Sequence, residues 1–324
     1  MTSPLRVALL DGARTQRARL AKVLTIPHEF VEIAGQRQVV DAAVGFRFGR
    51  REAEQLRVRL VHVPGAGADA VDMEALESDC AVCNVFEHEV PVAEYVLAAV
   101  LNHAIGYPGM IRDFVAEKWG ETYFARQPHG EIAGSVIGLV GFGHIGKAVA
   151  ERARAFGMRV HAVSRSGQAA QADWAADVSK LPELLACADF LVIACPLTAE
   201  TRGLIGVKEF AVMKRSAVLI NIGRAQVVDE EALFQALESG RLGGATLDVW
   251  YQYPESAGDS QARPARFPFD RLPNVHCTAH SSAWTEAMFD RRYAVIADNL
   301  ARLYSGQPLR NVIRPATGHV GESA

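Results

Sequence analysis

Short apolar runs alternate with helix-like patterns through the middle and C-terminal parts of the chain. The runs are VIGLVG from 136, RVHAV from 159, DFLVIAC from 189, AVLINIG from 217, GATLDV from 244 and NVHCTAH from 274. They are apolar throughout, which is typical of parallel strands that helices cover on both faces. Six buried strands separated by helices therefore predict a doubly wound α/β domain.

The intervening helices have recognisable ends. One begins at His144 and stops at Gly157, and another follows Asp229, a suitable N-cap, and ends at Gly240. The first carries an apolar stripe at helical spacing, made of Ile145, Val149, Ala153 and Phe156. We expect this stripe to face the sheet.

The N-terminal part repeats the alternation on a smaller scale, with LRVALLDG from 5, a helix-like segment at 15–24, and then QVVDAAVG, RLVHVPGAG and CAVCNV. Residues 94–120 are predicted to form long helices, and the helix predicted within 284–306 is expected to return to the first domain. We predict two Rossmann-like doubly wound domains with a cleft between them. A flavodoxin-like substrate domain takes 1–99 and 283–324, and a dinucleotide-binding Rossmann domain takes 100–282.

Composition narrows the classes of function. The 324 residues are 49% hydrophobic and 22% charged, with a net charge of -3 and scattered basic residues, which disfavours nucleic acid as a partner. No run of 18 apolar residues predicts a membrane span. The five cysteines are odd in number and follow no secretory signal, so we expect reduced thiols and a cytoplasmic protein. Cys80 and Cys83 form a C-x-x-C, which we interpret as part of a buried strand and not as a metal or redox site.

A glycine-rich loop joins the first strand of the central block to the helix after it. GLVGFGHIG places Gly141, Gly143 and Gly146 as G-x-G-x-x-G. The first glycine permits a tight turn, the second lets the backbone approach a pyrophosphate, and the third lets helix and strand pack closely. We predict that a dinucleotide binds the loop formed by Gly141, Phe142, Gly143, His144, Ile145 and Gly146.

The segment after the second strand indicates which dinucleotide binds. An NAD site usually has Asp or Glu there to hold the ribose 2′-hydroxyl, whereas this chain has Ser164, Arg165 and Ser166. One cation and two hydroxyls suit a 2′-phosphate, so NADP is favoured. In the alternative, Arg165 stacks on the adenine of NAD.

Two polar residues follow buried strands, at the edge where open α/β sheets bind ligands. Arg224 directly follows AVLINIG, and His280 is the last residue of NVHCTAH. Beside a nicotinamide, an arginine can hold a substrate carboxylate with both nitrogens, and a histidine can exchange a proton with the oxygen that changes between carbonyl and hydroxyl.

Taken together, the motifs resemble those of the D-2-hydroxyacid dehydrogenase family. This family includes glyoxylate and hydroxypyruvate reductases, D-lactate and phosphoglycerate dehydrogenases, and formate and phosphite dehydrogenases. The matching pieces are PGAGADAVD near 64, VAEY at 92, GLVGFGHIG at 138, CPLTAETRGLI at 195, NIGRAQVVDEEAL at 221, GATLDV at 244 and TAHSSAWT at 278. The resemblance covers nearly the whole chain.

The resemblance implies roles for particular residues. Arg224 and His280 would be catalytic, and the backbone of Ala66 and Gly67 would hold the substrate carboxylate. The remaining implied cofactor contacts are Cys195, Pro196, Thr201, Ile222, Gly223, Asp248 and Ser282. Members of the family are commonly dimers, so a homodimer is expected.

The stretch LDVWYQYPES departs from the family pattern. Most relatives carry a Glu five residues after Asp248, where it bonds the catalytic histidine, and this chain has Tyr253 there. Without that acid we expect His280 near the reference pKa of about 6.5, with reduction weakening above pH 7. Three alternatives remain open for the missing acid. Glu255 could take its place beside His280, a carboxylate of the other domain could do so, or the reaction could run toward oxidation with neutral His280 as the base.

The aromatic residues of that stretch have two interpretations. Trp250, Tyr251 and Tyr253 either pack under the long loop at 251–271 or shape an acyl pocket, and Trp284 would add to its wall. We expect hydride transfer between NAD(P)H and C2 of a small 2-oxo or 2-hydroxy acid. The alternatives are oxidation of formate or phosphite, favoured by Tyr253, and a non-enzymatic dinucleotide sensor similar to the C-terminal-binding corepressors.

Overall fold

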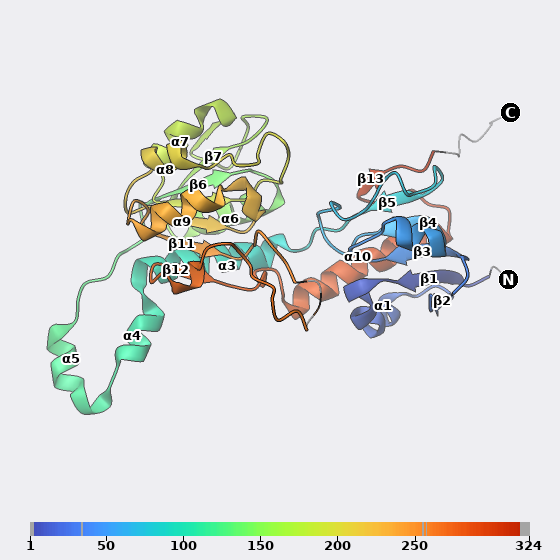
Figure 1. The fold of residues 1–324 in the computed structure, drawn as a ribbon, viewed down its shortest axis with the longest axis horizontal. Coiled ribbons are helices and arrows are strands. Elements are labelled where there is room, and N and C mark those ends of the chain that lie inside the picture. The colour runs from blue at the N-terminus through green and yellow to red at the C-terminus, as the bar shows by residue number, and fades with distance from the viewer. Residues whose placement is uncertain (1–2, 34, 255, 257, 318–324) are drawn as a thin grey trace. The chain divides into compact units, whose positions relative to one another are not determined.

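The computed structural model describes residues 3–33, 35–254, 256 and 258–317, and the chain divides into two compact units (Figure 1). Unit 1 comprises Met1–Glu87 with Thr285–Ala324, and unit 2 comprises His88–Trp284. The sequence-based boundary between 99 and 100 falls inside helix α3 (Glu89–Ile105). The apolar face of this helix packs in the core of unit 2, so the whole helix belongs there.

The described residues of unit 2 form a seven-stranded parallel sheet in the order β12-β11-β10-β9-β6-β7-β8. Its strands are β6 (Val136–Val140), β7 (Arg159–Val163), β8 (Trp174–Ala176), β9 (Phe190–Ile193), β10 (Val218–Asn221), β11 (Gly244–Leu247) and β12 (Val275–Cys277). The six predicted strands are confirmed. Strand β8 was not predicted because it is three residues long and lies at the edge of the sheet.

Helices cover both faces of this sheet, as the apolar strands predict. Leu139 and Val192 pack in one core with α3 and α6 (His144–Ala155), whereas Leu191 and Ile193 pack in the core on the other face. That second face is covered by α7 (Leu181–Cys187), α8 (Val207–Val212) and α9 (Glu230–Glu238). The predicted place of Phe156 in the buried stripe is wrong. Helix α6 ends one residue earlier, and Phe156 is 46% exposed.

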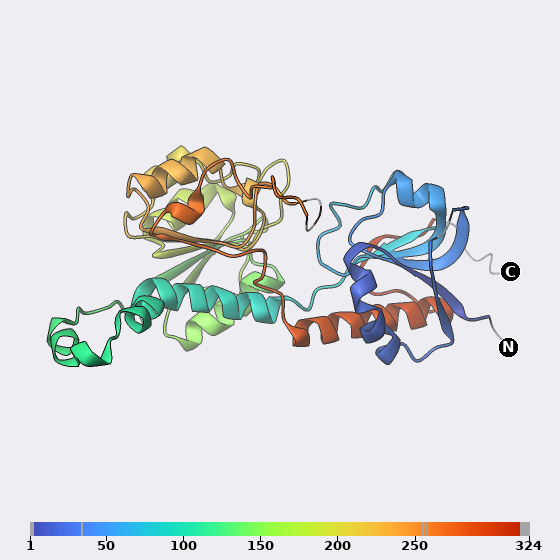
Figure 2. The same ribbon diagram turned by 60° about the horizontal axis from the view of Figure 1, so that its bottom comes forward.

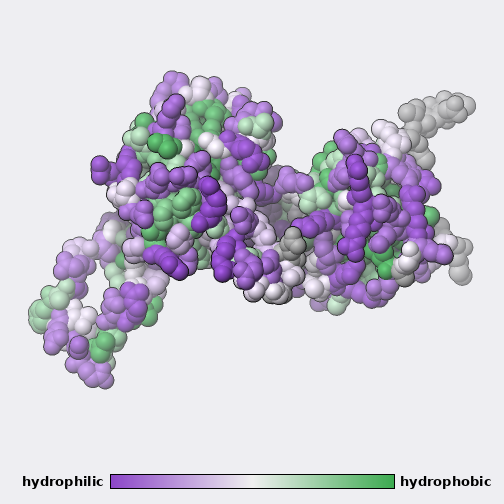
Figure 3. Space-filling model, in the orientation of Figure 1, coloured by the Kyte–Doolittle hydropathy of each residue, from purple (hydrophilic) through white to green (hydrophobic). Residues whose placement is uncertain are grey.

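A segment of unit 2 extends away from its sheet, as Figures 1 and 2 show. It consists of α4 (Tyr107–Asp113), a 3-10 turn, and α5 (Trp119–Ala125), and we call it the arm. The arm exposes apolar side chains at Tyr107, Met110, Ile111, Phe114, Val115, Trp119, Tyr123 and Phe124. Figure 3 shows hydrophobic residues on this segment interspersed with hydrophilic ones.

The described part of unit 1 has a six-stranded sheet in the order β13-β5-β4-β3-β1-β2, parallel except for β13. The strands are β1 (Leu5–Leu9), β2 (His28–Val31), β3 (Gln38–Val44), β4 (Leu56–His62), β5 (Ala81–Cys83) and β13 (Val312–Arg314). The helices are α1 (Arg17–Val23), α2 (Arg50–Gln55) and α10 (Glu286–Tyr304). The prediction that the last long helix returns to the first domain is confirmed, because α10 buries Phe289, Tyr293 and Ile296 in this core.

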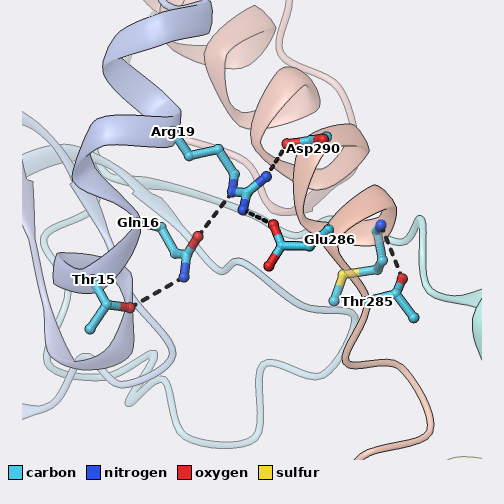
Figure 4. A network of polar contacts seen from close by, with 7 residues as sticks. Thr15, Gln16, Arg19, Thr285, Glu286 and Asp290 are labelled. Atoms are coloured by element: carbon cyan, nitrogen blue, oxygen red, sulfur yellow. Dashed lines mark hydrogen bonds and ion pairs between the residues drawn. The ribbon is translucent and has the colours of Figure 1, made fainter.

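A polar network fastens α10 to α1 in unit 1 (Figure 4). Arg19 on α1 forms ion pairs with Glu286 and Asp290 on α10, and its Nε donates to Gln16 at 3.0 Å. Thr285 caps α10 by accepting the Met288 amide hydrogen at 3.2 Å. These contacts join segments that are about 270 residues apart in sequence.

The C-x-x-C lies in the interior, as the sequence predicts. Cys80 precedes β5 and Cys83 ends it, and both are buried. Burial raises the pKa of Cys80 to about 11 and that of Cys83 to about 12, which keeps both thiols protonated. Within the described ranges, no helix has the length and apolar character to cross a bilayer, and no three metal-binding side chains cluster.

Candidate active site

The candidate residues of unit 2 follow the carboxyl ends of neighbouring strands. The chain starts in the middle of the sheet at β6, runs outward through β7 and β8, and returns to β9 on the other side of β6. Open α/β sheets bind ligands where the strand order reverses in this way. The loops after β6 and β9 are therefore the expected cofactor edge.

The geometry of the glycine loop explains each of its glycines. Gly141 has φ +102°, and a Cβ there would lie 2.8 Å from the Cys195 amide nitrogen. A Cβ on Gly146 would lie 2.5 Å from the Gly141 carbonyl oxygen, so only glycine lets α6 pack this closely on β6. Apart from Gly143 itself and its two chain neighbours, no described atom lies within 4 Å of a Cβ built on Gly143, which leaves this backbone open to a ligand. Gly143 is the N-cap of α6, so the helix begins where a phosphate would bind.

Two polar loops flank the glycine loop. After β7, Ser164 and Ser166 lie with their hydroxyl oxygens 3.4 Å apart, and Arg165 between them is exposed. After β9, Thr201 donates to the Pro196 carbonyl at 2.7 Å and closes a compact turn that starts next to Cys195. The Thr198 hydroxyl and, to a smaller extent, the Arg165 charge lower the pKa of Glu200 in this second loop.

A buried asparagine holds the turn that carries Arg224. Asn221 ends β10 and is 2% exposed. Its Oδ1 accepts the Gly223 amide hydrogen at 3.2 Å, and its Nδ2 donates to the Arg224 carbonyl at 3.2 Å. A Cβ on Gly223 would lie 3.0 Å from the Cys195 carbonyl oxygen, so Ile222 and Gly223 run close to the loop after β9. The Arg224 side chain is half-buried and its Nη1 donates to the Gly223 carbonyl.

Asp248 anchors the turn that follows β12. This aspartate is fully buried at the end of β11. It accepts hydrogen bonds from the Thr278 hydroxyl at 2.6 Å, the Ser281 amide at 2.7 Å and the Ser282 amide at 3.0 Å. The turn holds His280 in the left-handed region with φ +56°, a conformation that a histidine adopts only when its surroundings impose it.

His280 lies beside Tyr253. The Tyr253 hydroxyl oxygen is 2.9 Å from His280 Nδ1, and the Trp250 amide donates to that same oxygen at 3.2 Å. Desolvation lowers the pKa of His280, Asp248 partly opposes this, and the positive charge of Arg224 lowers it again. Arg224 also acts on the pKa of Tyr253, which burial raises. The arginine, the histidine and the tyrosine therefore share one electrostatic environment.

The aromatic residues of the stretch LDVWYQYPES separate into two groups. Trp250 is 8% exposed and donates its indole hydrogen to the Thr278 carbonyl, and Tyr251 donates to the Val228 carbonyl at 2.9 Å, so these two pack as the structural interpretation predicts. Tyr253 is 52% exposed and contacts His280 instead. Trp284 is 67% exposed. Glu255, a suggested alternative partner of His280, lies outside the described residues.

Ala66 and Gly67 belong to unit 1. They lie in the loop after β4, where the Asn84 side chain donates to the Ala66 carbonyl at 2.7 Å. The Val85 amide donates to the Gly65 carbonyl at 3.2 Å, so β5 and its extension hold this loop from one side. Gly67 is exposed and Ala66 is half-buried.

Sequence reasoning missed three residues that position this site. Asn221, Thr278 and Tyr95 are polar residues within or beside apolar runs, and the Tyr95 hydroxyl lies 2.6 Å from the Thr278 hydroxyl. A polar side chain that ends a buried strand and is followed by glycine was the available signal for Asn221. No local signal reveals Tyr95, because its partner is 183 residues away in sequence.

Comparisons with known proteins identify the family of the chain. Residues 97–282, more than half of the chain, match the model of the NAD binding domain of D-isomer specific 2-hydroxyacid dehydrogenases. Glyoxylate/hydroxypyruvate reductase B of Pectobacterium atrosepticum is 40% identical over 231 residues, which is 69% of this chain and 68% of that protein. D-3-phosphoglycerate dehydrogenase of Methanocaldococcus jannaschii is 30% identical over 81% of this chain, and the match spans about half of that longer relative, 48%.

A solved structure matches the fold of nearly the whole chain. The NADPH-dependent glyoxylate/hydroxypyruvate reductase of Sinorhizobium meliloti, in complex with NADP and sulfate, superposes with a TM-score of 0.77 and 26% identity. The match covers 96% of this chain and 98% of that one. The chain therefore belongs to the D-isomer specific 2-hydroxyacid dehydrogenase family, as an NAD(P)-dependent oxidoreductase of the glyoxylate reductase type.

Proposed function

We propose that the enzyme is an NADPH-preferring reductase of small 2-oxoacids, in which Arg224 holds the substrate carboxylate and His280 supplies the proton. The observation that supports this most is the placement of Arg224, Tyr253 and His280 after β10, β11 and β12, where the Arg224 charge acts to lower the pKa of both Tyr253 and His280. A guanidinium binds a carboxylate through two parallel hydrogen bonds. A histidine at this position can protonate the oxygen of C2.

The remaining site residues have supporting roles in this proposal. When the cofactor is bound, its reduced nicotinamide supplies the hydride. The open backbone at Gly143 fits the pyrophosphate of the dinucleotide. Asp248 and Ser282 lie beside His280 and would face the carboxamide, and the backbone of Ala66 and Gly67 would contribute to carboxylate binding. Trp284 would border the substrate side chain, which favours apolar or aromatic acids over phosphorylated ones.

The direct test is the absorbance of reduced nicotinamide in the presence of purified enzyme. NADPH and NADH are each mixed with glyoxylate, hydroxypyruvate, pyruvate and phenylpyruvate, and formate and phosphite are tested with NADP and NAD in the oxidative direction. We expect the fastest loss of absorbance with NADPH, and the best acid reports the size of the pocket. An enzyme that oxidises no reduced cofactor with any 2-oxoacid would contradict the proposal.

A double variant tests the preference for NADP. Ser164→Asp combined with Arg165→Ala removes the cation that would meet a 2′-phosphate and adds a carboxylate for the 2′-hydroxyl of NAD. We expect the ratio of kcat/KM for NADPH to that for NADH to fall by on the order of a hundredfold, from lost charge pairing and new repulsion. Arg159→Ala, at the opposite end of β7, is the matched control. An unchanged ratio in the double variant would show that these residues do not contact the phosphate.

The arm supports a second proposal, that the enzyme is a homodimer. Its exposed aromatic residues contact one another, with ring centroids 5.9 Å apart for Phe114 and Trp119 and 5.3 Å apart for Trp119 and Tyr123. Phe124 is 88% exposed, and an apolar surface of this kind usually lies in an interface. We expect light scattering after size exclusion to give twice the chain mass, and Trp119→Asp with Phe124→Asp to give the monomer.

A further inference from the structure

The hydrogen bonds around Tyr253 leave its hydroxyl hydrogen available to His280. The Trp250 amide, which can only donate, lies 3.2 Å from the Tyr253 hydroxyl oxygen, so that oxygen is the acceptor. The hydroxyl has one hydrogen of its own, and His280 Nδ1 lies 2.9 Å from it. A phenol that donates to Nδ1 requires a lone pair on this nitrogen, and in that arrangement neutral His280 carries its hydrogen on Nε2.

Both ends of this bond are held by the same structural element. The indole of Trp250 is buried and bonded to the Thr278 carbonyl at 2.8 Å, which fixes the Trp250 amide beside Tyr253. Thr278, Ser281 and Ser282 all bond Asp248, and His280 lies within this turn. The orientation of the imidazole and the hydroxyl toward each other is therefore built into the turn.

We propose that Tyr253 is a positioning residue that sets the tautomer of His280 and relays a proton to it. This inference rests on the proposed reductase function. As hydride from the reduced nicotinamide forms the new C2–H bond and the carbonyl π bond breaks, the Nε2 hydrogen of neutral His280 passes to the substrate oxygen. The Tyr253 hydroxyl hydrogen passes to Nδ1, which keeps the imidazole neutral. After the product leaves, the Nδ1 hydrogen returns to the phenolate oxygen and Nε2 takes a proton from water, which reaches the exposed His280 side chain and restores the starting tautomer.

The charges that face the pair suit this relay. Burial raises the pKa of Tyr253, whereas the Trp250 amide and the Arg224 charge act in the opposite direction and stabilise the phenolate; Asp248 opposes them. Desolvation lowers the pKa of His280, with Asp248 raising it and Arg224 lowering it. The neutral ring is thus the principal form at neutral pH, and the relay lets that form act as a proton donor. Reduction then continues above pH 7, in place of the decline expected for imidazolium alone.

The test is the pH profile of Tyr253→Phe, which keeps the ring and removes the hydroxyl. We expect kcat/KM for reduction with NADPH to stay within about threefold of the unsubstituted enzyme at pH 5.5, where imidazolium donates. At pH 8.5 the imidazolium fraction is on the order of 1% or less for a pKa at or below 6.5, so the variant should fall on the order of a hundredfold. The unsubstituted enzyme should change by less than about threefold over this range.

Tyr251→Phe is the matched control, because it removes a neighbouring hydroxyl that bonds the Val228 carbonyl instead of His280. Its profile should follow that of the unsubstituted enzyme. Two results would overturn the relay: superimposable profiles for Tyr253→Phe and the unsubstituted enzyme, or a tenfold loss per pH unit above pH 7 in the unsubstituted enzyme itself.

A second readout is independent of catalysis. The nitrogen-15 shifts of the imidazole, assigned by comparison with His280→Gln, report which nitrogen carries hydrogen at pH 8. We expect Nε2–H, and a predominant Nδ1–H form would contradict the inference even if no substrate were found. Absence of reductase activity across all 2-oxoacids, with Nε2–H present, would instead count against the proposed function alone.

Discussion

Replacing Arg224 with alanine should lower kcat/KM for the 2-oxoacid by a hundredfold or more. The guanidinium is held by the Asn221-bonded turn, and its charge influences both His280 and Tyr253. Loss of a two-point charged contact to the substrate in the transition state costs several kcal/mol. Arg224→Lys should recover little, because an ammonium keeps the charge but lacks the planar pair of donors.

The measurement is steady-state kinetics at saturating NADPH, with cofactor affinity determined separately by fluorescence quenching. Arg215→Ala is the control, since Arg215 is exposed and precedes β10, whereas Arg224 follows it. The control should stay within about twofold. Unaltered kcat/KM in Arg224→Ala, with cofactor binding intact, would show that Arg224 does not hold the substrate carboxylate.

Asp248→Ala should be nearly as damaging for a different reason. Its carboxylate bonds two backbone amides and one hydroxyl in the turn that holds His280 at a positive φ. Hydrogen bonds to a charged group contribute about 1.5–3 kcal/mol each, and a strained backbone conformation costs about 1–3 kcal/mol, so the turn should relax once the anchor is lost. We expect a loss on the order of a hundredfold or more in kcat/KM because His280 is misplaced.

Urea unfolding of Asp248→Ala measures how much stability the protein loses, separately from the loss of kcat/KM. Thr278→Val provides a milder change in the same turn. That variant removes one of the three bonds and leaves the carboxylate on both amides, so its loss of activity should be intermediate. A fully active Asp248→Ala enzyme would mean that the turn keeps its shape without the anchor.

The sequence predicts the architecture well because each element carries its own local signal. The central strands of unit 2, such as β6, are apolar runs, and the glycine loop is recognised from the spacing of Gly141, Gly143 and Gly146 between β6 and α6. Arg224 and His280 are found because they follow such runs. The sequence does not predict β2 and β13. Both are short edge strands, half-buried or exposed, that depend on their neighbours for pairing.

The interior of the site is less predictable, because its geometry depends on partners far apart in sequence. Asp248 and Ser282 are separated by 34 positions, and Tyr95 and Thr278 by 183. The family pattern indicates that residue 253 faces the histidine, but the second contact of its hydroxyl, with the Trp250 amide, is visible only in the folded chain.

The discontinuity of unit 1 has a consequence for biosynthesis. Unit 2 is continuous in sequence, whereas α10 and β13 of unit 1 follow unit 2 in the chain and so leave the ribosome after it. Until then, the nascent strands β1 and β3 lack the helix that covers Leu5, Val7 and Val44. Domains generally fold as they emerge, so unit 2 is free to fold while the N-terminal sheet waits with apolar surface exposed. A chaperone that binds nascent apolar segments should therefore engage residues 1–87 for longer than any part of unit 2.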